Sequence, residues 1–323
     1  MLFESGMIAQ QTHCAMGTIV SHKAFGIYAE ESLLAVRSEI ERLEKLFSRF
    51  LPQSEISLVN QAAGIRSEKV SLDTFEVLST AVEFSAHCRG LLDITINPLV
   101  DLWCSAKDSF SPPDETKIKD VLALVNYTDL YLDAEQRTAG LHNIGQSIDL
   151  GGIGKGYTAN KIVEMYQTFG IRSAFSNLGG NVVTLGTKPD GSPWKIGIRH
   201  PRQEKRLIGV VSAVNQTVVT SGDYQRYFTG KNGKRYHHIL DPLNGYPAES
   251  GLISVSIVTD DSMTADALST MVFMAGMEKG LELLRGYPQT EAILVDSDEE
   301  VFVTKGLIDC FQADKSIRLN NLH

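Results

Sequence analysis

A glycine-rich stretch near the middle of the chain, SIDLGGIGKGYTAN at residues 147–160, restricts most strongly what the chain around it can form. Its glycines follow a short apolar run and precede residues with helical apolar spacing. We expect a strand over 148–150, a turn at the glycines and a helix over 156–168. Glycines allow close approach of the backbone, and the N–H groups at a helix start attract anions. Lys155 adds a mobile positive charge, so the predicted ligand is anionic.

The two common phosphate-binding loops do not match this stretch. The dinucleotide fingerprint needs a third glycine where Tyr157 stands, and a Walker loop needs Ser or Thr where Gly156 follows Lys155. A tight turn whose glycines serve only the packing of helix on strand explains the same residues. From this stretch alone, both interpretations stay open.

The composition favours a globular protein that binds small molecules or other proteins. A chain of 323 residues with 43% hydrophobic content can bury a large core. The net charge of -9 and the lack of Lys or Arg blocks argue against a nucleic-acid partner. Cys14, Cys88, Cys104 and Cys310 have no paired spacing, which is typical of free or buried thiols in a reducing compartment.

No segment of the sequence predicts stable membrane insertion. The first residues, MLFESGMIAQQTHC, lack the basic start and apolar run of a signal peptide. No later stretch is apolar for long enough to span a bilayer. We therefore expect a cytoplasmic protein, or a periplasmic one if a leader had been removed.

Helical and strand-like patterns alternate irregularly, which favours an α+β architecture with mixed sheets over a doubly wound parallel sheet. The expected helices span 29–50, 73–88, 114–125, 265–275 and 277–284. The expected strands lie within 19–28, 130–150, 174–178, 182–259 and 292–304, and a Ser/Pro-rich loop spans 105–113. The first helix has an apolar stripe that we assign to the core, made of Leu33, Leu34, Ile40, Leu43, Phe47 and Phe50.

Three further segments carry polar residues that need partners or could do chemistry. Asp93 and Asn97 interrupt an apolar run, so they need partners from the protein or from a ligand. Asp266 and Thr270 are four apart and share one helix face, where their oxygens could hold magnesium with a backbone carbonyl beside a pyrophosphate. Asp266 could instead only favour the helix dipole, with Thr264 as an ordinary N-cap, and both interpretations stay open.

The segment RYHHILDPLNGYP contains a possible general base. In a strand, His237 and His238 point to opposite faces, so at most one enters a given site. A histidine followed three residues later by Asp241 suits removal of a proton from an attacking hydroxyl, although a lone histidine is more often structural. In TSGDYQRY, Asp223 and Arg226 lie near a glycine, and we interpret them as part of a solvated turn.

Taken together and in this order, nine segments resemble the FAD:protein FMN transferases of the ApbE family. They are MGT at Met16, SEISLVN, DITINPLVDLW, DLGGIGKGY, NLGGN, the PW-K-I-G-I strand, TSGDY, HHILDPLNGYP and ADALST. The resemblance implies an α+β domain related to the tunnelling fold over 16–323, with two interleaved lobes around an FAD cleft, and an N-terminal extension over 1–15. It also implies transfer of the FMN half of FAD to a Thr or Ser hydroxyl of an acceptor flavoprotein, with release of AMP.

The resemblance also implies roles for single residues. The Mg²⁺ ligands would be Gly154, through its carbonyl, and the side chains of Asp266 and Thr270. The FAD contacts would be Met16, Glu55, Ile56, Ser57, Asp93, Lys155, Gly179, Gly180, His238 and Ile239. His238, and not His237, matches the histidine that deprotonates the acceptor hydroxyl, and Lys155 and Asp241 complete the expected catalytic set.

Some positions depart from the family pattern, and two other functions stay open. Relatives often have Ala at Gly154, which a carbonyl ligand tolerates, and commonly have Asp where Asn160 and Asn181 stand. Cys14 lacks the apolar run of a lipobox, so a cytosolic acceptor is expected. An FAD pyrophosphatase, in which water replaces the protein hydroxyl, would use the same site. A non-catalytic FAD-binding protein would not need the metal ligands or His238.

Overall fold

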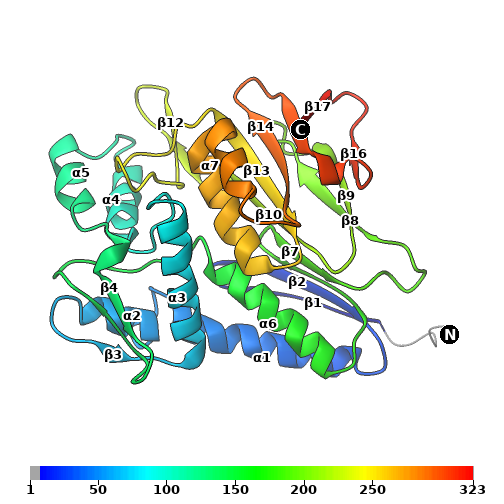
Figure 1. Cartoon of the computed structure of the whole chain (residues 1–323), viewed down its shortest axis with the longest axis horizontal. Helices are drawn as coiled ribbons and strands as arrows, with labels where there is room; N and C mark the ends of the chain where they lie inside the picture. The colour runs from blue at the N-terminus through cyan, green and yellow to red at the C-terminus, as the bar shows by residue number, and fades with distance from the viewer. Residues whose placement is uncertain (1–7, 323) are drawn as a thin grey trace.

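The computed structural model describes residues 8–322 and is built on one sheet of nine strands (Figure 1). In spatial order they are β1 (Ile8–Ala15), β2 (Thr18–Phe25), β6 (Ser173–Leu178), β7 (Asn181–Leu185), β10 (Thr217–Gly222), β13 (Leu252–Thr259), β14 (Glu291–Asp296), β15 (Val301–Thr304) and β17 (Leu319–Leu322). Neighbours are antiparallel, except that β15 and β17 run parallel. One face of the sheet is covered by α1 (Ala29–Phe47), α6 (Gly154–Thr168) and α7 (Ser262–Leu284).

A smaller sheet covers the other face of the large one. Its strands, in order, are β16 (Phe311–Ala313), β9 (Leu207–Ala213) and β8 (Trp194–Arg199). Side chains of β10 alternate between the two faces, as the pleat of a strand requires. Val218 packs in one apolar cluster with Trp194 of β8, and Val219 packs in another with Leu268 of α7. The large sheet is therefore the middle layer of three.

The remaining elements form a group beside α6 and α7, at the left of Figure 1. Its helices are α2 (Glu55–Gln61), α3 (Leu72–His87), α4 (Asn97–Lys107) and α5 (Glu115–Leu122). Its strands are β3 (Glu68–Lys69), β5 (Thr138–Leu141) and β4 (Leu130–Asp133), and the ribbon of β11 (Tyr227–Thr229) and β12 (Arg235–His237) lies above them. This arrangement confirms the predicted α+β class with mixed, mostly antiparallel sheets and flanking helices.

Two local predictions around the sheet and the glycine stretch were wrong. Residues 8–15, placed above in an N-terminal extension, form β1 and pair with β2 along their whole length. Residues 148–150 form no strand: the side chain of Asn60 bonds both the N–H and the carbonyl of Ile148, and pairing with residues 94–96 is limited to an isolated bridge at Ser147 and the bond from the Asp149 N–H to the Ile94 carbonyl. Helix α6 accordingly begins at Gly154, two residues before the predicted start.

The predicted apolar stripe of α1 is correct only in part. Leu33, Ile40, Leu43 and Phe47 are buried, whereas Leu34 and Phe50 are 63% and 77% exposed. Leu34 lies next to Leu33 in sequence and is therefore rotated away from the stripe. Phe50 follows the end of the helix, where the guanidinium of Arg49 stacks 4.3 Å from its ring centre.

Helix α7 begins earlier than predicted and is broken where predicted. Its N-cap is Asp261, whose carboxylate accepts the N–H of Thr264 at 2.6 Å, so Thr264 is not the cap. The expected boundary between two helices at residue 276 is confirmed as a break at Gly276, with φ of 78°. Only glycine fits this position easily, because a β-carbon would also come within 2.9 Å of the Ser250 carbonyl oxygen.

The first turns of α6 and α7 pack directly on each other. A β-carbon on Gly156 would lie 2.7 Å from the Met263 α-carbon and 2.8 Å from the Asp266 β-carbon. The Gly156 N–H instead donates to Asp266 Oδ2 at 2.9 Å. One turn further along α6, the Asn160 amide bonds the Asp261 carboxylate and the Ser262 N–H. The two helix starts are thus fixed relative to each other by hydrogen bonds.

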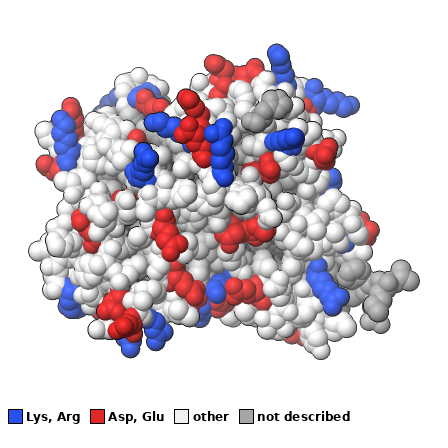
Figure 2. Space-filling view, in the orientation of Figure 1, with Lys and Arg blue, Asp and Glu red and all other residues white. Residues whose placement is uncertain are grey.

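The surface carries charges of both signs. On the face shown in Figure 2, acidic side chains lie across the middle, and Lys and Arg are interspersed around them. Within residues 8–322, no helix is both long and apolar enough to cross a membrane.

A buried histidine makes the stability of the sheet sensitive to pH. His22 on β2 bonds Ser176 of β6 through Nδ1 at 2.8 Å, and Ser176 also bonds the Tyr166 hydroxyl of α6. Burial lowers the pKa of His22 to about 4, and the neighbouring His13 lowers it further. Because the unfolded chain binds a proton more readily, this group costs stability as the pH falls from 6.5 towards 4.

We predict that His22→Gln flattens the pH dependence of stability. The variant can still hydrogen-bond Ser176 but has no proton to gain. In the wild type, the titration of His22 lowers the free energy of unfolding by up to about 3 kcal/mol between pH 6.5 and pH 4. Urea denaturation at several pH values measures the slope, and the exposed His142→Gln is the matched control. Equal slopes in wild type and His22→Gln would contradict the assignment.

We also predict that Gly156→Ala destabilises the protein and Gly154→Ala does not. At residue 156 the new methyl group meets backbone atoms of α7 that cannot move away alone, so a loss of about 1–3 kcal/mol is expected. At residue 154 the nearest atom is 3.4 Å away, and alanine favours the helix by up to about 1 kcal/mol. Thermal and urea unfolding compare the two, and equal stabilities would argue against the close crossing.

Candidate active site

The glycine turn is fixed by hydrogen bonds and an ion pair of Asp149, which directly precedes it. Asp149 Oδ1 accepts the N–H of Gly151 at 2.6 Å, and Asp149 Oδ2 pairs with Arg49 at 2.8 Å. The Lys155 ammonium donates to the Gly151 carbonyl at 3.0 Å and is partly exposed. The turn therefore leads directly into α6, and the Lys155 ammonium lies beside it, as the sequence predicted. Asp149 was not singled out from the sequence, because an Asp before glycines also suits any turn.

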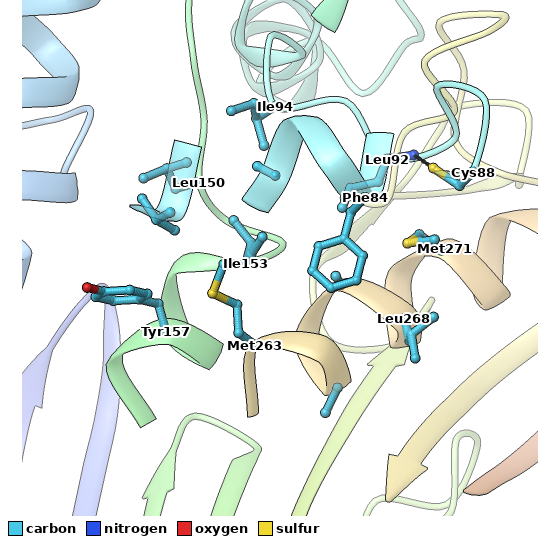
Figure 3. Packing of buried hydrophobic residues seen from close by; sticks show 14 of the residues in the cluster. Phe84, Cys88, Leu92, Ile94, Leu150, Ile153, Tyr157, Met263, Leu268 and Met271 are labelled. Atoms are coloured by element: carbon cyan, nitrogen blue, oxygen red, sulfur yellow. Dashed lines mark hydrogen bonds between the residues drawn. The ribbon is translucent and has the colours of Figure 1, made fainter. Parts of the chain in front are cut away.

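Figure 3 shows the apolar residues under this turn. Ile153 from the start of α6 and Met263 from the start of α7 lie beside each other, and Leu150 and Ile94 lie above them. Tyr157 points away from these residues, and its hydroxyl lies 2.8 Å from carboxylate oxygens of both Asp73 and Glu76 on α3. The turn thus packs on buried apolar side chains, and Tyr157 links the start of α6 to α3 by hydrogen bonds.

The predicted metal ligands are brought together by the crossing of α6 and α7. Asp266 is buried and bonds the Gly156 N–H through one carboxylate oxygen. Thr270 lies one turn along α7, and a β-carbon on Gly152 would be 3.7 Å from its hydroxyl. The Gly154 carbonyl lies in the first turn of α6, where it accepts the Thr158 hydroxyl at 2.8 Å in addition to the helical N–H of the same residue, so a metal would have to share an oxygen that is already bonded.

These three groups fit a magnesium ion by their chemistry. Carboxylate, hydroxyl and carbonyl are all hard oxygen donors, which Mg²⁺ prefers, and water and phosphate usually complete its shell. Asp266 has a carboxylate oxygen for which the described contacts give no bond. In the described part of the chain, no group of three or more His, Cys, Asp or Glu could hold a metal. A site with a single carboxylate is therefore the kind that these residues could form.

The two neighbouring histidines at the end of β12 have different surroundings, as predicted. His237 is buried, its Nε2 lies 3.0 Å from the Ala248 carbonyl, and its Nδ1 accepts the Ile239 N–H. His238 directly follows the strand and is partly open to solvent. Its Nδ1 lies 3.1 Å from the Arg226 carbonyl, which can only accept, so Nδ1 carries the proton and Nε2 keeps a free lone pair. His237 is thus structural, and His238 can accept a proton.

The pKa of His238 is lowered to about 4. The largest cause is desolvation, because protein atoms crowd the ring on most sides even though part of the residue remains exposed. The positive charges of Arg226 and Lys155 lower it further. At neutral pH the ring is therefore uncharged and keeps its lone pair.

Two hairpin turns of the large sheet meet beside these groups. Met16 adopts a φ of 50°, and its N–H donates to Glu44 of α1 at 2.8 Å. Gly179 in the turn between β6 and β7 packs on Thr18, so closely that a β-carbon there would collide with the threonine side chain. Gly180, with φ of 109°, donates its N–H to Asn177. The predicted FAD-contacting turns thus lie at one end of the sheet.

Asn181, directly after this turn, has a buried amide nitrogen without a partner in the described structure. An unpaired buried donor costs about 1–3 kcal/mol of stability, so we expect a group there that accepts a hydrogen bond from the Asn181 amide. Asn160, the other departure from the family pattern, is occupied by its bonds to the start of α7.

Several predicted contact residues are occupied by structural bonds. Glu55 accepts the N–H and hydroxyl of Ser71, and Ser57 donates to the Ser48 carbonyl. Ile56 and Ile239 are buried in the main apolar cluster. These side chains hold the elements around the glycine turn, so their contact with FAD stays a prediction.

Two predicted carboxylates are also occupied. Asp93 accepts the Thr95 N–H and hydroxyl and the Tyr127 N–H, and its pKa is raised because it is buried. Both oxygens of Asp241 bond within its own turn, to Leu243 and Asn244. Asp241 therefore shapes the turn after His238, and a direct catalytic part for it stays a prediction.

The residues of TSGDYQRY do more than the predicted solvated turn. Asp223 is buried and pairs with both terminal nitrogens of Arg202, at 2.6 and 2.7 Å. Arg226 bonds His238 through its carbonyl and Gly17 through its guanidinium. The sequence shows Asp, Arg and a glycine here, but the partners are distant in the chain and only the fold brings them together.

Comparison with known proteins gives consistent results. The model of the ApbE family matches residues 16–294. A Klebsiella pneumoniae protein named FAD:protein FMN transferase is 35% identical over 281 residues, which are 86% of this chain and 87% of the relative. One of the same name from Treponema pallidum is 32% identical over 314 residues, covering 92% and 85% of the two chains.

Solved structures agree with these relatives. The ApbE protein from Thermotoga maritima has a TM-score of 0.85 at 29% identity, covering 93% of this chain and 98% of its own. The flavinyl transferase ApbE from Pseudomonas stutzeri, in its apo form, has a TM-score of 0.82 at 27% identity, covering 97% and 100%. The matched residues include the glycine turn, His238, Asp266 and Thr270. The resemblance seen in the motifs is therefore confirmed, and the chain belongs to the ApbE family.

Proposed function

We propose that this protein is a Mg²⁺-dependent FAD:protein FMN transferase that modifies a Thr or Ser hydroxyl of a flavoprotein. Family membership and the names of its relatives support the transferase activity. The observation that carries the proposal is the crossing of α6 and α7. It sets Asp266, Thr270 and the Gly154 carbonyl beside a glycine turn that ends in Lys155.

The residues of the chain divide the work of this reaction. The acceptor hydroxyl forms a bond to the FMN phosphorus, the pyrophosphate bond breaks, and AMP leaves with the bonding electrons. His238 Nε2 takes the proton of the hydroxyl, since Nδ1 is committed to the Arg226 carbonyl. Lys155 and the positive end of the α6 dipole attract the phosphates. A magnesium ion held by the three oxygen donors would supply further positive charge against the pyrophosphate.

The chemistry of the site is equally suited to water as the acceptor. The pyrophosphatase alternative therefore differs from the transferase only in what reaches His238. The direct experiment incubates the protein with FAD, Mg²⁺ and a flavoprotein domain that carries a Thr acceptor, and follows AMP together with the intact mass of the acceptor. Covalent FMN on the acceptor with matching AMP supports the proposal. AMP and free FMN formed at the same rate without acceptor would favour hydrolysis.

We predict that Asp266→Asn lowers the rate of transfer by at least about 100-fold. The amide oxygen can still accept the Gly156 N–H, so the fold is kept, but the charge that attracts the metal is lost. Excess EDTA is expected to stop the wild-type reaction. Titration with Mn²⁺ followed by electron paramagnetic resonance measures binding apart from activity.

The matched control is Asp260→Asn, an exposed acid just before α7, which should keep activity and Mn²⁺ binding. Normal Mn²⁺ affinity in Asp266→Asn, or full activity in EDTA, would contradict the metal assignment.

A further inference from the structure

We propose that Arg226 is a positioning residue for His238: its carbonyl orients the imidazole ring, and its guanidinium fastens that carbonyl to the hairpin turn at Gly17. This inference rests on the proposed function, in which His238 takes the acceptor proton. Arg226 lies between β10 and β11 and is exposed. It is therefore not needed to fill the core.

Two hydrogen bonds join His238 to a single carbonyl. The backbone N–H of His238 donates to the Arg226 oxygen at 3.0 Å, and the ring Nδ1 donates to the same oxygen at 3.1 Å. The first bond sets where the residue sits, and the second sets the tautomer and the rotation of the ring. With Nδ1 protonated, the lone pair lies on Nε2, which is the state that a general base needs.

The guanidinium links this carbonyl to a rigid part of the molecule. Arg226 Nη2 donates to the Gly17 carbonyl at 3.3 Å, across 209 residues of sequence. Gly17 belongs to the turn between β1 and β2, which pair in full register, and the preceding Met16 is bonded to α1. The only described side-chain link of Arg226 is thus to the end of the large sheet where the predicted FAD contacts gather. Losing it frees the segment that carries the oxygen to move relative to that end.

The charge of Arg226 and its carbonyl act in opposite directions on the protonation of the His238 ring. The charged or titratable groups that act on the His238 ring are Arg226, Lys155 and the neighbouring His237. Desolvation is the largest effect against a second proton on the ring and each of these groups adds to it, whereas the bond to the Arg226 carbonyl favours that proton. Removing the guanidinium therefore removes one charge that lowers the pKa of His238 and weakens one bond that raises it, while exchanging it for an ammonium keeps the positive charge.

The test compares Arg226→Met, Arg226→Lys and Lys231→Met in the full-length protein. Methionine keeps an unbranched chain but loses both charge and donor, whereas lysine keeps both. Lys231 is an exposed cation in the same hairpin and is the matched control. Nitrogen-15 NMR of the histidine rings, without FAD, reports the tautomer and pKa of His238. Steady-state kinetics at several pH values report kcat and the KM for FAD.

In Arg226→Met we expect a mixed tautomer, a changed pKa of His238 and a kcat lower by on the order of tenfold, with little change in KM. We expect the acid limb of the pH profile to move in the same direction and by the same amount as the NMR pKa. Arg226→Lys should largely restore these values, and Lys231→Met should match the wild type.

Two results would overturn the positioning role. One is a His238 tautomer and pKa in Arg226→Met that equal those of the Lys231→Met control. The other is a raised KM for FAD with unchanged NMR, which would make Arg226 a ligand contact instead. Altered NMR with an unchanged kcat would support the orienting role of Arg226 but refute the use of His238 as the base. Failure of the proposed function would therefore be visible separately from failure of this inference.

Discussion

The hydrogen bond from the Gly156 N–H to the Asp266 carboxylate is the interaction on which the rest of the site depends. It forms only because residue 156 has no side chain, so that the first turn of α6 can lie against the first turn of α7. The same contact brings the Gly154 carbonyl and the Thr270 hydroxyl into the region of one carboxylate. It also fixes the start of α6, and with it Lys155, next to the first turn of α7. A side chain at residue 156 would separate all of these groups at once.

Further bonds to α7, α3 and α1 stabilise this crossing of α6 and α7. Asn160 bonds the cap of α7, and the Tyr157 hydroxyl reaches two carboxylates on α3. Arg42 pairs with one of them, Asp73, at 2.9 Å and so joins α1 to the same network. His238 is linked to the large sheet through Arg226, which bonds the carbonyl of Gly17. The proposed metal ligands and the proposed base are therefore held by different parts of the fold: the first by the crossing of α6 and α7, the second by the bond of Arg226 to the turn at Gly17.

The sequence predicted the fold class, most helices and the importance of the glycine stretch, because these follow from local periodicity and from glycine content. It could not reveal β1, since a polar edge strand has no apolar run, nor the loss of the strand at 148–150, since that depends on the distant side chain of Asn60. The choice between His237 and His238 followed from a motif, and their opposite surroundings agree with it. The link from Arg226 to Gly17 spans 209 residues and leaves no local pattern to recognise.

The central claim is that the crossing of α6 and α7 creates a metal and phosphate site. The most direct measurement is a crystal structure of the protein with Mn²⁺ and FAD, in which anomalous scattering locates the metal. The account predicts one peak within coordination distance of the Asp266 carboxylate, the Thr270 hydroxyl and the Gly154 carbonyl, with the FAD pyrophosphate beside it. Bound FAD with its pyrophosphate away from the glycine turn, or a metal held by other residues, would contradict it.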